Sequence, residues 1–151
     1  NLLSIRSLLK VTNRKEFFIK KSLSIYTITF LFTLMDITSH IQKIKAEIPE
    51  SVRLIAVTKQ VSVEFIRQAY AAGIRDFAEN RLQEALEKQE QLQDLSDICW
   101  HFIGHLQTNK IQKVLHNFHW IHSVDSLKLA QRLDCLGENV TTLPQLCLQV
   151  K

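Results

Sequence analysis

The sequence of 151 residues contains little glycine, proline or cysteine, with 3, 2 and 3 residues of each. So little glycine and proline excludes a collagen-like chain, and 46% apolar residues exclude a wholly disordered one. Three cysteines without a CxxC pair exclude a disulfide scaffold and predict reduced thiols in a cytosolic, cytoplasmic protein. The length suits one compact domain and is too short for two ordinary ones.

Two kinds of ligand motif are also missing. The glycines are isolated at Gly73, Gly104 and Gly137, so the sequence has no glycine-rich phosphate loop. The histidines show no metal-ligand spacing with acidic partners, and the cysteines are scattered. We therefore expect no metal site.

Positive charge is concentrated at the start of the chain. The net charge is +4. Residues 1–34 hold six basic residues and one acidic residue, whereas the remainder holds 13 basic and 14 acidic residues. The high isoelectric point, near 9.1, therefore comes from residues 1–34. The remainder of the chain has no excess of positive charge that would indicate nucleic-acid binding.

The leader, residues 1–34, differs in pattern from the rest of the chain. Its apolar run, residues 23–35, is 13 residues long and so too short for a bilayer, which needs about 20 residues. Basic residues before a short apolar run are typical of a secretory signal, but the run is not succeeded by a small-x-small cleavage site. The only methionine is Met35. We predict a disordered or mistranslated upstream leader over 1–34 and a body over 35–151; a targeting or a structural segment remains the alternative.

The body repeats a unit of one short strand and one amphipathic helix, at a period of about 20–26 residues. The predicted strands are residues 52–57, 74–78, 99–103, 120–124 and 145–150. Such near-continuous apolar strands between helices predict an α/β protein with a parallel sheet. An open doubly wound sheet and part of an eightfold barrel both fit this pattern.

Polar residues come directly after several of these strands, at the edge where ligands bind in both architectures. Lys59 lies two residues after Val57, where partial burial would make its amine nucleophilic, although a solvated loop lysine explains it as well. Asn80 could bind a ligand or cap the next helix. Glu79 could act as an acid or base, or face solvent. His101 alternates with two large apolar residues and is either a ligand contact or a core histidine with its hydrogen bonds satisfied.

Four segments together resemble a known family. They are residues 54–60 (LIAVTKQ), 77–84 (FAENRLQE), 100–110 (WHFIGHLQTNK) and 121–126 (IHSVDS). In order and spacing they are similar to the pyridoxal phosphate homeostasis proteins, whose barrel is similar to the N-terminal domain of alanine racemase. The likeness covers residues 35–151, and the 100–110 string is long and specific.

This resemblance implies part of a (β/α)8 TIM barrel, with about five of eight units and parallel strands. It implies that Lys59 forms a Schiff base with pyridoxal 5′-phosphate, that Asn80 lies beside this cofactor, and that His101 and Ser123 line the pocket. Family members bind, store or deliver the cofactor inside the cell, so the expected partners are pyridoxal phosphate and apo-enzymes that need it. We expect no enzymatic activity, no membrane, no nucleic acid, and a monomer for a full-length chain.

The chain departs from the family pattern in two ways. Ala78 stands where the family usually has glycine, and the family's three further β/α units, which hold the phosphate-binding turns, are not in the sequence. A slice of a barrel exposes strand edges and apolar side chains, so we expect a marginally stable or aggregation-prone fragment. Two alternatives stay open: a fold-type III enzyme related to amino-acid racemases, and a non-functional fragment that only binds other proteins. The first needs an acid or base opposite Lys59, and neither Tyr26 nor Tyr70 is well placed for it.

Overall fold

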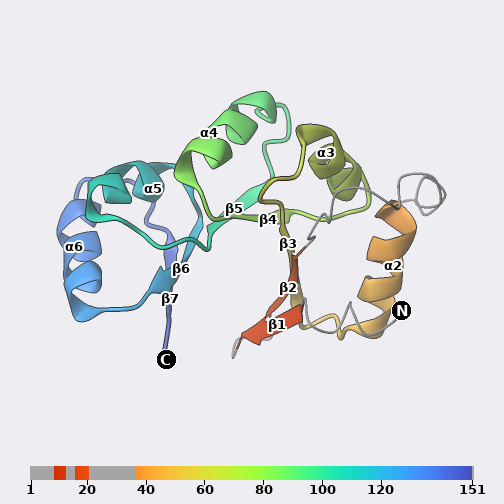
Figure 1. Ribbon diagram of the computed structural model, residues 1–151, viewed down its shortest axis with the longest axis horizontal. Helices are drawn as coiled ribbons and strands as arrows, with labels where there is room; N and C mark the ends of the chain where they lie inside the picture. The colour runs from red at the N-terminus through yellow and green to blue at the C-terminus, as the bar shows by residue number, and fades with distance from the viewer. Residues whose placement is uncertain (1–8, 13–15, 21–36, 151) are drawn as a thin grey trace. The chain divides into compact units, whose positions relative to one another are not determined.

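The computed structural model describes residues 9–12, 16–20 and 37–150. The chain forms two compact units, residues 1–75 and 76–151, and each is described by itself. The first unit contains strands β1 (Leu9–Thr12), β2 (Glu16–Lys20) and β3 (Arg53–Val57) and helices α2 (Ile37–Glu47) and α3 (Val63–Ala71) (Figure 1). Strand β2 pairs antiparallel with β1 and parallel with β3.

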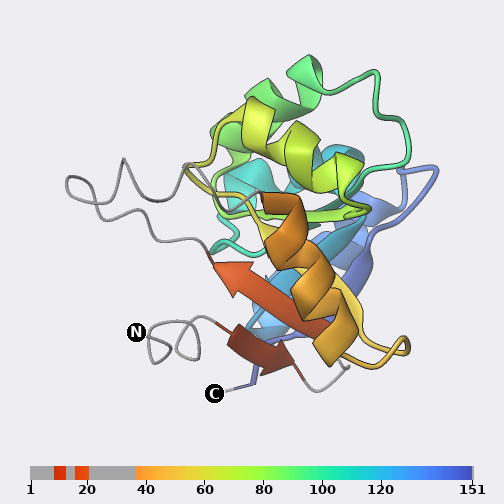
Figure 2. The same cartoon turned by 90° about the vertical axis from the view of Figure 1, so that its right-hand side faces the viewer.

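Helices α2 and α3 of the first unit pack side by side (Figure 2). After helix α3 the chain turns at Gly73, which takes a φ of +87° that other residues rarely adopt. The amides of Gly73 and Ile74 donate to the carbonyls of Tyr70 and Ala69, at 2.9 and 3.0 Å, and form a Schellman motif. From α2, the Lys45 amine donates to the Gly73 carbonyl at 2.8 Å and so ties the two helices together.

The second unit alternates strands with helices along its whole length. Its strands are β4 (Asp76–Glu79), β5 (Cys99–Phe102), β6 (Trp120–Val124) and β7 (Gln145–Leu148). Its helices are α4 (Leu82–Gln91), the short 3-10 helix η1 (Thr108–Lys110), α5 (Ile111–Asn117) and α6 (Leu127–Gly137). The strands lie in chain order and each pairs parallel with the next, as the near-continuous apolar runs predict.

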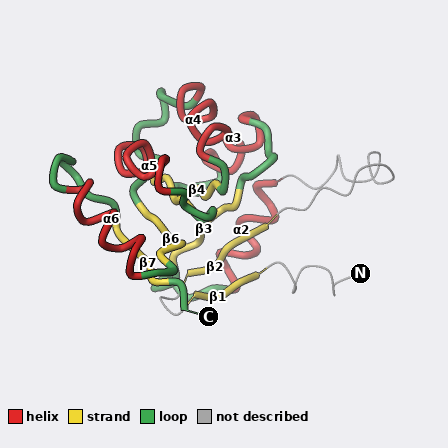
Figure 3. The backbone as a smooth tube through the Cα atoms, turned by 60° about the vertical axis from the view of Figure 1, so that its left-hand side comes forward, coloured by secondary structure: helices red, strands yellow, loops and turns green. Residues whose placement is uncertain are grey.

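The helices of the second unit lie on one side of its strands (Figure 3). Phe77 and Phe102 are buried completely or nearly so on this side, and the Phe102 ring meets the edge of Phe118 at the end of α5, with ring centres 5.2 Å apart. Because side chains alternate along a strand, His101 and Asp76 project from the opposite face.

A buried ion pair joins strand β4 to helix α4. The Lys88 amine lies 2.8 Å from the Glu79 carboxylate and 2.6 Å from that of Glu84, one helical turn earlier. Glu79 is fully buried and Lys88 nearly so. Since a buried charge is costly unless it is paired, this contact fixes how α4 lies on the sheet. Glu79 therefore does not face solvent, which corrects one of the two interpretations of its sequence position.

Strand β7 carries exposed apolar side chains, as the sequence predicts for a partial barrel. Leu148 is 78% exposed, and Val150, just beyond the strand, is 89% exposed. An open groove of about 380 Å³ lies beside this strand, over α6, and is lined by Leu127, Leu133, Leu143 and Leu146, among others. No residue predicted to bind the cofactor lines this groove. Aggregation of the chain stays a prediction.

The predicted strands of the body are all present, each within two residues of its expected ends. Within residues 1–34, the described pieces are the strands β1 and β2, and the other residues lie outside the described part. The prediction that this leader lies outside the domain stays a prediction. Among the described residues, no helix is long and apolar enough to span a membrane.

Replacing Lys88 should destabilise the fold strongly. In Lys88→Met the Glu79 carboxylate stays buried without its lysine, which typically costs about 3–5 kcal/mol of unfolding free energy. Urea denaturation followed by circular dichroism measures this loss. The double variant Glu79→Gln/Lys88→Met removes the charge as well and should recover much of the stability. Equal stability of Lys88→Met and the unmodified chain would show that this ion pair does not hold α4 in place.

Candidate functional site

Lys59 lies in a tight turn directly after strand β3. The Val61 amide donates to the Thr58 carbonyl at 2.9 Å, and Gln60 between them has a φ of +58°. Glycine or asparagine is usual at this position of such a turn, so glutamine there stores backbone strain. The Lys59 side chain is half-buried, and its amine has no hydrogen bond or ion pair with the described residues.

Asn80 comes directly after strand β4, and the structure excludes one of the two interpretations of it. Helix α4 begins after Arg81, which is the N-cap residue, so Asn80 does not cap the helix as the sequence allowed. The Asn80 side chain is half-buried, and its amide makes no hydrogen bond within the described part of the chain. A ligand contact at Asn80 stays a prediction.

Gly104 supports the backbone of Asn80 from the loop after β5. The Ile103 amide donates to the Glu79 carbonyl at 2.9 Å, which draws the two strand ends together. A side chain at Gly104 would overlap the Asn80 carbonyl oxygen and lie 2.8 Å from its carbon. The absence of a side chain at Gly104 is therefore what lets the two loops touch.

The loops after β5 and β6 also meet at this edge. His105 Nδ1 lies 3.9 Å from the Asp125 carboxylate, and both belong to the polar clusters that come after their strands. The His105 side chain is exposed. Within the second unit, the carboxyl ends of β4, β5 and β6 therefore share one polar edge, as parallel pairing requires.

Ser123 is buried in strand β6, and its hydroxyl oxygen has no hydrogen-bond partner among the described residues. The register between β6 and β7 shifts between Ile121 and Val124 and interrupts the regular ladder around this serine. A buried polar group without a partner is uncommon in a folded protein, and a ligand is one explanation.

His101 is fully buried, and both of its ring nitrogens have protein partners. Nε2 lies 2.9 Å from the Asp76 carboxylate, and Nδ1 lies 2.9 Å from Nε2 of His122. The ring also stacks on Trp120, with centres 5.8 Å apart and planes 11° apart. This arrangement matches the core histidine with satisfied hydrogen bonds that the sequence allowed.

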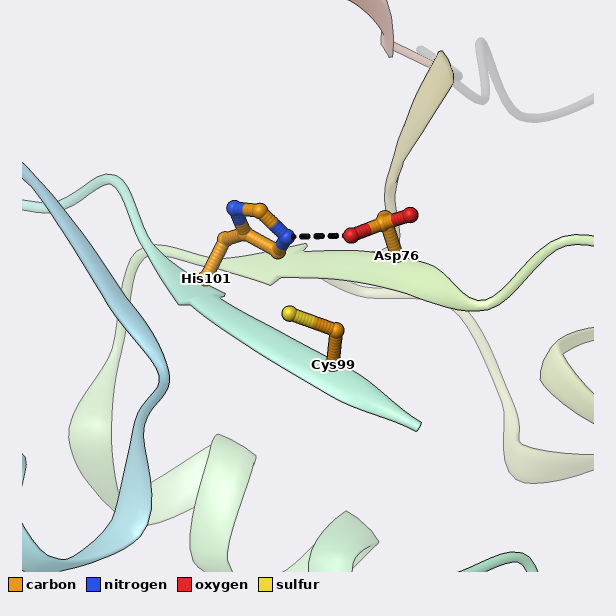
Figure 4. Close-up of side chains that lie close together, drawn as sticks. All are labelled: Asp76, Cys99 and His101. Carbon is orange, nitrogen blue, oxygen red and sulfur yellow. Dashed lines mark hydrogen bonds and ion pairs between the residues drawn. The ribbon is translucent and has the colours of Figure 1, made fainter. Parts of the chain in front are cut away.

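Sequence reasoning missed the partners of His101. Asp76 lies opposite Cys99 in the register of β4 and β5, and His101 lies two residues after Cys99 on the same face (Figure 4). One donor atom from each of these three residues lies within 4.8 Å of the others. The sequence does show that Cys99 and His101, and likewise Trp120 and His122, alternate and so share one face of a strand. Which residues of the neighbouring strand lie beside them depends on the strand register, which the sequence does not give.

The surroundings of His119 favour its unprotonated form. Its Nδ1 accepts a hydrogen bond from the Trp100 amide at 2.9 Å, which requires an unprotonated nitrogen there. Desolvation lowers the pKa of His119, the electrostatic interaction with His101 lowers it further, and the Asp76 carboxylate opposes the shift. The neutral imidazole is therefore the form that the fold favours.

Comparison with known proteins identifies the fold family. Residues 33–150 match the family model of the alanine racemase N-terminal domain. The chain belongs to this family. It is 55% identical over 109 residues to the pyridoxal phosphate homeostasis protein of Synechocystis sp., and 51% identical over 104 residues to that of Pseudomonas aeruginosa. These matches cover 72% and 68% of this chain, and 50% and 44% of the relatives.

A solved structure agrees with these relatives. PipY of Synechococcus elongatus, solved with PLP bound, is 50% identical to this chain and superposes with a TM-score of 0.74. The match covers 76% of this chain and 54% of PipY. The chain thus spans about half the length of the relatives it matches. These comparisons confirm the predicted family and the predicted class, an α/β partial barrel.

The comparisons do not test individual site residues, so the roles of Lys59, Asn80, His101 and Ser123 stay predictions. Of the tyrosines considered as acid or base, Tyr70 lies in α3 with the Arg75 guanidinium 3.8 Å above its ring. Tyr26 lies outside the described residues.

A methyl group at Gly104 should disturb the edge that holds Asn80. In Gly104→Ala the new carbon meets rigid backbone, and overpacking of this kind costs about 1–3 kcal/mol. Gly137→Ala is the matched control, because its new carbon meets only the flexible Leu143 side chain. Urea midpoints should fall for Gly104→Ala and change little for Gly137→Ala. Equal midpoints for the two variants would contradict the close approach to Asn80.

The lowered pKa of His119 predicts a stability that falls in acid. The unfolded imidazole titrates near its ordinary pKa of about 6.5, so below that pH the unfolded state binds more protons than the folded state. This contribution is present above the unfolded pKa and is lost as the pH falls through the folded pKa. His119→Asn keeps an acceptor near Nδ1 but does not titrate. Its stability should therefore fall less than that of the unmodified chain between about pH 7.5 and pH 5.5. Parallel curves would exclude His119 as a contributor.

Proposed function

We propose that this chain binds pyridoxal 5′-phosphate and serves the intracellular homeostasis of this cofactor, with Lys59 as its covalent anchor. The proposal depends mainly on one observation: Lys59 is half-buried directly after β3, and its amine has no hydrogen bond or ion pair with the described residues. The names of the relatives and the PLP-bound PipY structure support it. The chain spans about half the length of these relatives, so the role that their names describe is a proposal for this chain.

The residues present fit the chemistry of this cofactor. Pyridoxal phosphate supplies an aldehyde carbon, with which a primary amine condenses and releases water. An amine that no carboxylate holds, such as that of Lys59, is suited to this attack. Asn80 and Ser123 offer an amide and a buried hydroxyl whose hydrogen bonds are unmade within the described residues. A polar cofactor could form hydrogen bonds with both of these groups.

The turn after β3 contributes to this role by limiting where Lys59 points. The left-handed conformation at Gln60 costs about 1–3 kcal/mol, and it persists only where the surroundings impose it. Strain of this kind often accompanies functional sites. In our proposal the strained turn holds the lysine in a small range of directions, so that less entropy is lost on binding.

His101 enters the proposal less directly than the other three residues. Both of its ring nitrogens are bonded to Asp76 and His122, so it has no hydrogen bond left to offer a ligand. We propose that its ring forms part of the pocket wall and that its partners hold it there. This role depends on position and packing and not on proton transfer.

We further propose that the chain is a carrier and not an enzyme, and that its partners include apo-enzymes that take up the cofactor. The relatives are named for homeostasis and not for a reaction. The three cysteines form no disulfide in the described part of the chain, which fits a reducing, cytosolic environment.

Lys59→Ala tests the anchor. The chain is incubated with pyridoxal phosphate and then with borohydride, which reduces the lysine–cofactor link to a stable bond. We expect one labelled site in the unmodified chain, which peptide mass mapping assigns to Lys59. Labelling of Lys59→Ala should fall at least about tenfold, because a covalent link to a held amine outcompetes random surface lysines.

Lys113→Ala is the matched control, since Lys113 is an exposed lysine on α5. It should be labelled as strongly as the unmodified chain. Equal labelling of Lys59→Ala and Lys113→Ala, with both variants folded by circular dichroism, would rule out Lys59 as the anchor.

A further inference from the structure

The cluster of Asp76, Cys99 and His101 brings together three side chains that commonly bind metals. A carboxylate oxygen, a thiol sulfur and an imidazole nitrogen lie within 4.8 Å of one another (Figure 4). Two adjacent strands supply them, with Asp76 paired to Cys99 and His101 two residues further along. Three donors on paired strands are held more rigidly than donors on loops.

We propose that these three residues form a binding site for Zn²⁺. Zinc takes nitrogen, sulfur and oxygen donors and often uses three protein ligands with a fourth position open to water. A thiolate and a carboxylate would also balance the two positive charges of the ion. Magnesium and calcium prefer all-oxygen sites and are disfavoured by the sulfur.

His122 contacts the second ring nitrogen of His101, as commonly happens at a histidine that binds a metal. A histidine that binds a metal through one nitrogen usually bonds through the other to a second group, which fixes the ring. His101 directs Nε2 toward Asp76 and directs Nδ1 to His122, 2.9 Å away. Stacking on Trp120 holds the same ring from its face. The nitrogen nearest the other two donors is thus already oriented.

Access to the cluster is also compatible with an ion. His101 is fully buried, but the Asp76 side chain is 17% exposed and Cys99 is partly exposed. An ion could therefore enter from the side of Asp76 and Cys99, while His101 forms the inner wall. Binding would replace the hydrogen bond between His101 and Asp76. In the bound form Nε2 and the Cys99 sulfur would carry no proton, Nδ1 would carry the ring proton toward His122, and the displaced protons would pass to solvent.

This inference shares His101 with the proposed function, but its other two ligands, Asp76 and Cys99, have no part in that function. The cluster lies in the second unit, at the start of β4 and β5, whereas Asn80 lies just past the end of β4. It also revises the expectation of no metal site, which came from spacing along the chain. Asp76 lies 23 positions before Cys99, and no short motif contains both.

Cobalt binding tests the site on the full chain, with no pyridoxal phosphate present. Co²⁺ replaces Zn²⁺ in such sites, and a thiolate ligand gives it an intense near-ultraviolet charge-transfer band. We expect this band at one Co²⁺ per chain, and we expect Zn²⁺ to abolish it. Cys99→Ser should lose the band, while Cys135→Ser, which removes an exposed thiol on α6, should keep it.

Asp76→Asn separates ligation from folding. This variant keeps the thiol, so the band should remain while the Co²⁺ affinity falls at least about tenfold, because a neutral amide is a weaker ligand than a carboxylate. A band that is absent from the unmodified chain, or that survives in Cys99→Ser, would overturn the proposal. So would an unchanged affinity in Asp76→Asn.

A measurement without variants covers the case in which Cys99→Ser does not fold. The unmodified chain is alkylated with iodoacetamide, with and without Zn²⁺, and each cysteine is followed by peptide mass mapping. A thiolate bound to zinc reacts slowly, so Zn²⁺ should slow alkylation of Cys99 at least about tenfold and leave Cys135 unaffected. Equal rates at Cys99 with and without Zn²⁺ would reject the site.

Discussion

Parallel hydrogen bonding between consecutive strands is the constraint on which the second unit depends. Strands that run the same way place all their carboxyl ends at one edge, and the chain must return across one face as a helix. The return of α4 over β4 brings Lys88 to Glu79, and the return of α5 brings Phe118 to Phe102. The polar residues at the strand ends are left at the shared edge, where His105 approaches Asp125.

Polar groups in this fold fall into two kinds, which differ in whether a protein partner already satisfies them. Glu79 and His101 are fully buried, and each has a charged or hydrogen-bonded partner at 2.8–2.9 Å. These groups lower the cost of their own burial and specify how elements pack. Lys59 and Asn80 are half-buried at strand ends, without side-chain hydrogen bonds in the described part of the chain. A polar cofactor can bond directly to the second kind, whereas a metal at His101 would first replace its hydrogen bond to Asp76.

Local patterns in the sequence predicted the elements, but contacts between them depended on geometry that no local pattern contains. Apolar runs placed β6 at Trp120–Val124, as observed. Asn80 matched the pattern of a helix cap, yet the helix begins after Arg81. Predicting the contact of Glu79 with Lys88 would require the angle at which α4 crosses the sheet. Predicting the contact of Asp76 with His101 would require the register of β4 and β5.

Asp76 lies at the amino end of β4 and Asn80 follows its carboxyl end, and these two positions have different physical consequences. In barrels of this kind, residues at the carboxyl ends serve ligands and residues at the amino ends serve stability. A metal bound by Asp76, Cys99 and His101 would bind the folded state alone, because the register of β4 and β5 assembles the donors. At one hundred times its dissociation constant such an ion adds about 2.7 kcal/mol to stability. It would thereby stabilise the sheet whose open edge, at β7, carries exposed Leu148.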